Sequence, residues 1–233
     1  MTLFDANHLV VDASLPLTTA QRGLWIGQKL NPHTSLKMAE ALELRGPIDA
    51  RLLLAASRQV AREFDNTRVR IVEEHGTPRQ IVDSDYGHAI PLIDLSGAPA
   101  PREAADRWIA EDLAQADDLA NGPLWTCALL RLAAEHHLWV QIVNHLVVDG
   151  YAGGMVAQRL AQIYSARAAG TEPPPCTAGP MAGLGEMEVA YRASDRYRRD
   201  RDYWRQTLAD PPPASRWRDG SGASRGGLLR GSG

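Results

Sequence analysis

Residues 138–150 read LWVQIVNHLVVDG, an apolar run that leads into a histidine, an aspartate and a glycine. The length and β-branched content of Leu138–Val143 predict a buried strand. A helical pattern follows, because apolar side chains recur on one face at Met155, Val156, Leu160 and Ile163. His145 therefore lies at the end of a strand. Asp149 and Gly150 lead into a helix N-terminus, where free N–H groups and the helix dipole favour negative charge.

The composition narrows the classes of protein to which the chain can belong. Its 233 residues allow one large or two small domains. Its net charge of -3 lacks the basic excess that is typical of nucleic-acid-binding proteins. No apolar run reaches membrane-spanning length, and residues 1–13 lack the basic start and apolar core of a signal peptide. We therefore expect neither a nucleic-acid nor a membrane partner.

The two cysteines, Cys127 and Cys176, form no metal-binding motif. Two cysteines without such a motif are typical of a reduced, cytoplasmic protein. The spacing of His145 and Asp149 would suit two metal ligands, but no third ligand accompanies them in the sequence. We expect no bound metal.

The remaining patterns predict alternating strands and helices. Thr18 and Gln21 have the spacing of a capping box, which opens a helix through about Leu30. We expect helices after Asp49 and over Arg102–Asp118, and strands at 38–45, 67–72, 79–82, 89–93, 124–132 and 137–143. This order predicts an α/β sandwich with a mixed sheet and helices on one face.

The two ends of the chain carry different signals. Residues Asn7–Asp12 repeat residues 144–149 letter for letter, but their flanks differ, so we interpret His8 as non-catalytic. The Gly- and Pro-rich segment Gly170–Gly185 predicts a linker, and Glu186–Leu208 predicts one charged helix. The Gly-, Ser- and Arg-rich tail after the prolines at 211–213 predicts disorder.

Three spaced stretches together resemble the motifs of nonribosomal peptide synthetase condensation domains. Pro16–Trp25 resembles the opening motif, and Glu63–Ile71 resembles the second without its usual Arg-His-Glu start. Asn144–Gly150 resembles the third, whose signature is His-His-x-x-x-Asp-Gly. Shorter stretches at 94–96, 118–124 and 202–204 also resemble this family, in the order in which the family has them. The resemblance therefore covers roughly residues 14–212.

The resemblance implies a fold and a division of the chain. The fold is the chloramphenicol-acetyltransferase-like two-layer sandwich, with a mixed sheet and helices on one face, and the chain supplies the N-terminal lobe only. That lobe is expected at 1–170, a linker at 171–185, the first helix of a second lobe at 186–212 and a disordered tail at 213–233. Because the later motifs of the family are missing, we expect a truncated, split or frame-shifted member.

The resemblance also implies roles for five residues. His145 is the expected catalytic group, a general base or a hydrogen-bonding group for an attacking amine, and Gly150 would present its N–H to a thioester oxygen. Asn144 replaces the first His of the signature, a mainly structural position. Asp149 would form an ion pair with Arg68 and so hold the loop of His145. Breaking a buried ion pair costs about 3–5 kcal/mol.

The implied reaction joins two thioesters on carrier proteins in secondary metabolism, such as antibiotic biosynthesis. No cofactor binds the chain directly, because the substrates arrive on the phosphopantetheine arms of donor and acceptor peptidyl carrier proteins. A separate second lobe or self-association would complete the site. Two alternatives remain: a non-catalytic carrier-protein-binding scaffold derived from a condensation domain, and a small-molecule acetyltransferase of similar fold, which needs a trimer.

Overall fold

The computed structural model describes residues 13–85 and 87–210. The expectations for the Asn7–Asp12 repeat and for the tail at 213–233 lie outside the described residues. The chain divides into two compact units, and the second begins at Ala190. The elements that position His145 all belong to the first unit.

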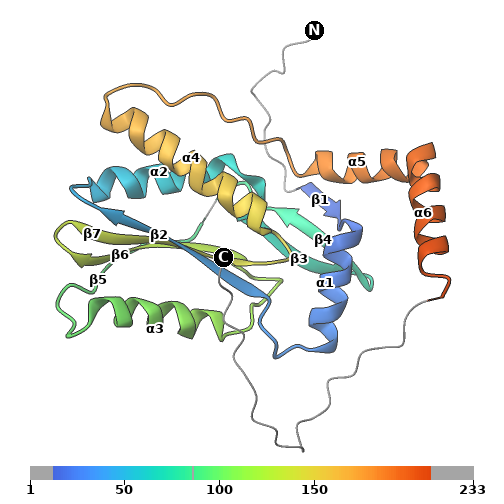
Figure 1. Ribbon diagram of the computed structural model, residues 1–233, viewed down its shortest axis with the longest axis horizontal. Coiled ribbons are helices and arrows are strands. Elements are labelled where there is room, and N and C mark those ends of the chain that lie inside the picture. Colours follow the sequence, from blue (N-terminus) through green and yellow to red (C-terminus); the bar gives the residue numbers. More distant parts are fainter. Residues whose placement is uncertain (1–12, 86, 211–233) are drawn as a thin grey trace, which may run out of the picture. The chain divides into compact units, whose positions relative to one another are not determined.

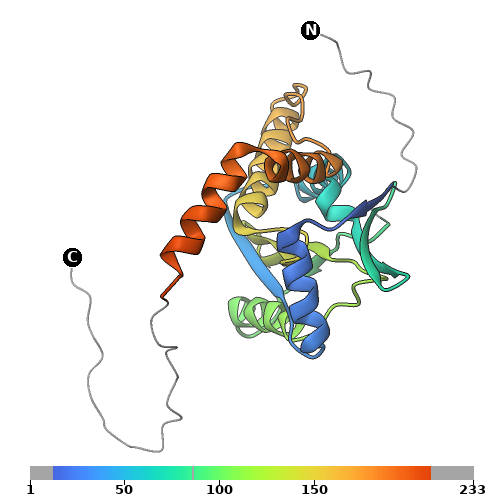
Figure 2. The same ribbon diagram turned by 90° about the vertical axis from the view of Figure 1, so that its right-hand side faces the viewer.

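The described strands form two sheets (Figure 1). The main sheet has the order β2-β7-β6-β5, and the small sheet has the order β1-β4-β3. In the main sheet β5 runs parallel to β6 while the other neighbours are antiparallel, so the sheet is mixed. Figure 2 shows β1 beside β4 in the small sheet. The strands are β1 (Ala13–Pro16), β2 (Lys37–Arg45), β3 (Val69–Glu74), β4 (Thr77–Val82), β5 (Leu92–Asp94), β6 (Trp125–Ala133) and β7 (His136–Asn144).

The helices begin largely where the sequence carries capping residues. Thr18 and Gln21 form the predicted capping box at the start of α1, and the Asp49 carboxylate accepts the Leu52 N–H at the start of α2. The helices are α1 (Thr19–Leu30), α2 (Ala50–Glu63), the short 3-10 helix η1 (Asp65–Arg68), α3 (Pro101–Leu113), α4 (Gly150–Ala168), α5 (Ala182–Ala193) and α6 (Asp195–Thr207).

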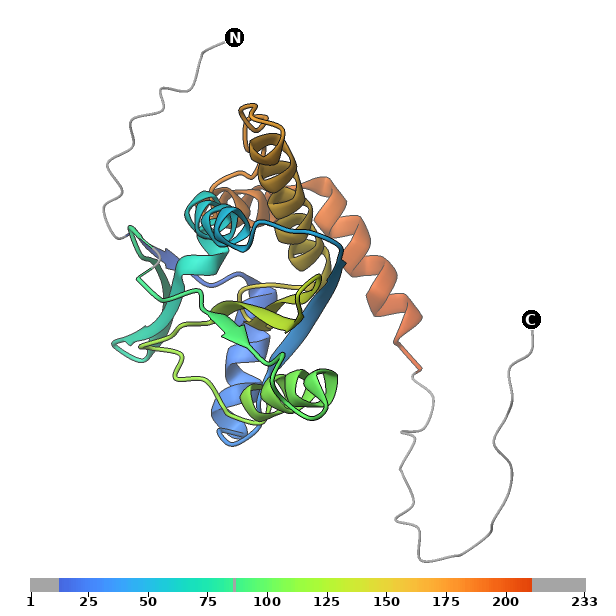
Figure 3. The ribbon, with the colours of Figure 1, turned by 90° about the vertical axis from the view of Figure 1, so that its left-hand side faces the viewer.

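The main sheet is covered on both faces (Figures 1 and 3). Helices α2 and α4 pack on the face that carries Trp125, Leu129 and Trp139. Helix α3 packs on the opposite face, against Leu130 and Val140. The predicted α/β class with a mixed sheet is confirmed, but the placement of all helices on one face is wrong. Strand β7 is buried along nearly its whole length, so both of its faces need apolar cover.

Helix α4 approaches the sheet closely at Gly153. A Cβ atom at this position would lie 3.2 Å from Glu40 Oε2 and 3.4 Å from Gln141 Nε2. The buried Gln141 donates to Glu40 Oε2 at 2.7 Å and accepts from Trp125 Nε1 at 2.9 Å. The polar groups under α4 are therefore paired, and the lack of a side chain at Gly153 leaves room for them.

A buried ion pair joins α4 to the end of α2. Arg159 Nε lies 2.6 Å from Glu63 Oε2, and Arg159 Nη2 donates to Glu63 Oε1 at 2.9 Å. The Arg159 side chain is only 6% exposed. Burial alone would raise the pKa of Glu63, but hydrogen bonds from Arg159 and Gln59 outweigh it and hold that pKa below its ordinary value.

The predicted single helix Glu186–Leu208 is wrong, because the chain forms α5 and α6 with a break at Ser194. The Ser194 hydroxyl accepts the Tyr197 N–H at 3.2 Å and so starts α6 anew. A serine that caps a helix favours such a break over a continuous helix. Among the described helices, none is both long and apolar enough to cross a membrane.

The ion pair between Arg159 and Glu63 predicts a selective loss of stability. We expect Arg159→Met to lower the free energy of unfolding by about 3–5 kcal/mol, because the Glu63 carboxylate, which is 20% exposed, loses both of its hydrogen bonds from Arg159. Arg102→Met is the matched control, since Arg102 and Asp106 form an exposed pair on α3. It should cost less than about 0.5 kcal/mol. Urea unfolding measures both, and equal losses would contradict the role of the buried pair.

Candidate functional site

His145 lies on a short loop that joins β7 to α4. Its backbone N–H donates to Leu36 O at 2.9 Å, and the Val147 N–H turns back to Asn144 O at 3.0 Å. Residues 146–148 are buried, whereas His145 itself is exposed. Three apolar side chains therefore anchor the loop in the core, and the imidazole is presented at the surface.

The imidazole is oriented by its own loop. His145 Nδ1 lies 3.1 Å from Val148 O. A carbonyl oxygen only accepts hydrogen bonds, so this contact places a hydrogen on Nδ1. In the neutral ring Nε2 then carries the free lone pair. The geometry leaves Nε2 as the nitrogen that can accept a proton or a hydrogen bond from a substrate.

A cavity of about 680 Å³ lies beside His145. It is bordered by the start of α1, the loop 145–149, the start of α4 and the segment 178–187. Its lining residues include the polar Thr18, Gln21, Asp65 and Asp149. Much of the rest is apolar, with side chains from Leu24, Phe64, Val147, Met155, Met181, Leu184 and Met187. Such a cavity suits an organic substrate held beside a small number of polar groups.

Asn144 lies behind this loop, away from the cavity wall. It is 1% exposed. Its side-chain Oδ1 accepts the Leu146 N–H at 2.9 Å, and its Nδ2 donates to Asp117 Oδ2 at 2.9 Å. These contacts tie the Asn144 side chain to the start of the loop and to Asp117.

The opening motif reaches the same loop through Gln21. Besides its capping bond with Thr18, Gln21 donates from Nε2 to Leu146 O at 3.1 Å and to Gln80 Oε1 at 2.9 Å. Sequence reasoning assigned only the capping role, and the contact across 125 residues was missed. A capping box is a local pattern, and nothing in it points to residue 146.

The ion pair expected between Asp149 and Arg68 is wrong. Asp149 is exposed and caps α4, where its carboxylate accepts the Ala152 N–H at 2.8 Å. Arg68 is buried and donates to Asp65 Oδ1 at 2.9 Å and to the carbonyl oxygen of Asp83. Asp65 precedes Arg68 by one turn of η1, so it supplies a nearer carboxylate than the loop of His145 does.

Gly150 is the first residue of α4, and its N–H has no acceptor within the helix. Its backbone φ lies outside the left-handed region, and a Cβ built on it meets nothing within 4 Å. The structure therefore does not require glycine here for a tight turn. Its N–H lies in the first turn of α4, where partial positive charge gathers.

Within residues 13–85 and 87–210, no group of three or more His, Cys, Asp or Glu side chains is arranged to hold a metal ion. Cys127 is buried, and burial raises the pKa of its thiol far above the ordinary value. A thiol of that kind is a poor nucleophile. Among the residues that line the cavity, His145 carries the imidazole, a side chain that can both accept and donate a hydrogen bond.

Comparison with known proteins gives one consistent family. The family model described as "Condensation domain" matches residues 11–216. The isonitrile lipopeptide synthase of Streptomyces coeruleorubidus is 36% identical over 203 residues, which are 86% of this chain and 14% of that protein. A dimodular nonribosomal peptide synthase of Bacillus subtilis is 32% identical over 202 residues, covering 86% of this chain and 8% of that protein.

The fold agrees with solved structures of the same family. A mutant of the starter condensation domain of rhizomide synthetase RzmA, in complex with C8-CoA, matches with a TM-score of 0.81 at 32% identity. The match covers 85% of this chain and 46% of that one, so this chain spans less than half of the solved domain. The expected chloramphenicol-acetyltransferase-like fold is confirmed. On its motifs, its fold and its relatives, the chain belongs to the condensation domain family of nonribosomal peptide synthetases.

Proposed function

We propose that this chain supplies the catalytic histidine of an amide-forming site, which is completed by the other half of a condensation domain. One observation carries the proposal: His145 borders the cavity, and its Nδ1 is engaged by Val148 O, which leaves Nε2 free for a substrate. The substrates are a donor thioester and an acceptor amine, each on the phosphopantetheine arm of a carrier protein.

The reaction needs no covalent bond to the protein. The acceptor amine attacks the thioester carbonyl carbon, the C–N bond forms, and the C–S bond breaks with its electron pair passing to sulfur. The proton that the amine loses ends on that sulfur as a thiol. His145 Nε2 accepts this proton and passes it on, or holds the amine in line by a hydrogen bond. Alignment of the two arms supplies much of the acceleration.

The apolar wall of the cavity supports an apolar acyl group on one of the two thioesters. Phe64, Met155 and Met181 line it together with several further aliphatic side chains. Burial of each methylene group of such an acyl chain contributes about 0.8 kcal/mol. Gly150 is not among the residues that line the cavity, but it directly follows Asp149, which is. Its N–H, at the positive end of α4, suits a thioester oxygen that gains negative charge.

The first prediction concerns His145. With two loaded carrier proteins and a separately produced second half of a condensation domain, we expect His145→Ala to slow single-turnover transfer at least about 100-fold. His136→Ala is the matched control, because His136 is a half-buried histidine at the other end of β7. His145→Gln separates the two roles, since glutamine hydrogen-bonds an amine but does not take its proton. Intact-protein mass spectrometry follows the transfer.

Unchanged transfer by His145→Ala would contradict the proposal. Binding of both carriers without any transfer, even with the second half present, would favour the scaffold alternative.

The second prediction concerns Asp149. Since it is an exposed helix cap, Asp149→Ala should cost about 1 kcal/mol of unfolding free energy. Asp49→Ala removes the equivalent cap of α2, far along the chain from His145, and should cost the same. Only Asp149→Ala should shift the NMR resonances of the His145 ring. A loss of about 3–5 kcal/mol for Asp149→Ala alone would instead indicate a buried ion pair.

A further inference from the structure

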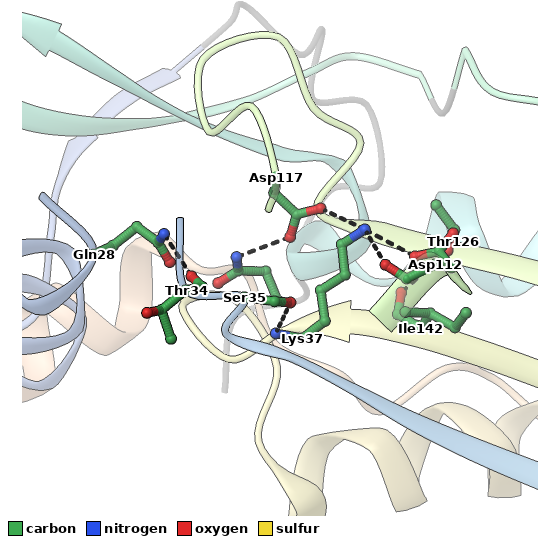
Figure 4. Close-up of polar contacts among 9 residues, drawn as sticks. Gln28, Thr34, Ser35, Lys37, Asp112, Asp117, Thr126 and Ile142 are labelled. Carbon is green, nitrogen blue, oxygen red and sulfur yellow. Dashed lines mark hydrogen bonds and ion pairs between the residues drawn. The ribbon is translucent and has the colours of Figure 1, made fainter. Parts of the chain in front are cut away.

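Four polar side chains form a connected cluster behind the loop of His145. Lys37 begins β2, Asp112 lies in the last turn of α3, Asp117 follows that helix, and Asn144 ends β7. Figure 4 shows Lys37 between the two aspartates. Lys37 Nζ lies 2.8 Å from Asp112 Oδ1 and 3.0 Å from Asp117 Oδ1, and it also donates to Asp112 O at 3.1 Å. The other oxygen of Asp117 accepts from Asn144 Nδ2 at 2.9 Å.

The cluster is buried enough for its charges to matter. The side chains of Asp117 and Lys37 are 8% and 12% exposed, and Asn144 is 1% exposed. Burial alone would lower the pKa of Lys37, but its hydrogen bonds to Asp112 and Asp117 outweigh burial and raise that pKa. Lys37 is therefore charged at neutral pH, and it holds the Asp117 carboxylate in place.

Asp117 leaves the Asn144 amide only one favourable orientation. With Nδ2 toward Asp117, Oδ1 faces the Leu146 N–H, and both ends of the amide are paired. A flipped amide would place Oδ1 against the carboxylate and Nδ2 against the N–H. Both contacts would then be repulsive, and Asn144 is only 1% exposed.

We infer that Asp117, held by Lys37, is a positioning residue for His145 and acts through Asn144. The carboxylate fixes the amide, the amide fixes the Leu146 N–H, and Leu146 directly follows His145 in the loop. The catalytic meaning of this chain of contacts rests on the proposed function, whereas the geometry can be tested without any transfer reaction.

The test exchanges the donor and the acceptor between positions 117 and 144. Asn144→Asp alone sets two carboxylates about 3 Å apart, so they repel and compete for one proton. Asp117→Asn alone removes the charge that orders the amide. In the double variant Asn144→Asp/Asp117→Asn, the carboxylate at 144 accepts from both the Leu146 N–H and the amide at 117. The amide oxygen at 117 then accepts from Lys37, and the total charge is unchanged.

The readouts are hydrogen exchange of the Leu146 N–H and the NMR resonances of the His145 ring, assigned by comparison with His145→Ala. We expect exchange about tenfold faster in Asn144→Asp, with most of the protection recovered in the double variant. Asp106→Asn, which breaks an exposed ion pair on α3, should change neither readout. If Asn144→Asp does not fold, a folded double variant would show the same coupling between positions 117 and 144, measured as recovered stability.

Additive effects of the two substitutions, or an unperturbed His145 ring in both single variants, would overturn the inference. A perturbed His145 ring in the single variants, with transfer activity unchanged, would instead support the inference and count against the proposed function.

Discussion

The site depends on how the chain leaves β7. Asn144 is the last residue of that strand, and its backbone N–H donates to Leu124 O. Its side-chain Oδ1 accepts the N–H of Leu146, in the loop that follows. Because the loop is only a few residues long, this buried amide helps to set where the His145 ring lies, together with the contact between His145 Nδ1 and Val148 O. The buried apolar residues 146–148 anchor the loop in the core. The position of the exposed imidazole therefore does not require packing of the His145 side chain itself.

Elements distant in the sequence converge on this loop. Strand β7 pairs with β2 on one side and β6 on the other, and the sheet is packed on both faces. Gln21 brings the start of α1 to Leu146 O, and Asp117 brings the loop after α3 to Asn144. Of the three condensation motifs, Asn144–Gly150 carries the histidine, and Pro16–Trp25 supports its loop through Gln21. Asn144 stands where the family signature has a histidine, and both ends of its amide are paired, with the Leu146 N–H and with Asp117.

Features set by local chemistry were predictable from the sequence. The capping box at Thr18, the cap at Asp49 and the strand that precedes His145 were all confirmed, since each depends on residues a few positions apart. Features that depend on residues far apart in the sequence were not predictable in this way. The face covered by α3 was mistaken because both faces of β7 are apolar. The partner of Arg68 was mistaken because Asp65 competes at shorter range, and the link from Lys37 through Asp117 to Asn144 joins segments that no periodicity relates.

The proposed function requires that His145 turns a free Nε2 toward the cavity while Val148 O holds Nδ1. Long-range ¹⁵N–¹H NMR of the histidine rings, at a pH where the His145 ring is neutral, tests it directly. The account predicts that the neutral ring carries its hydrogen on Nδ1, and that a pantetheine thioester bound in the cavity perturbs the Nε2 resonance. A ring with its hydrogen on Nε2, unaffected by the thioester, would contradict it.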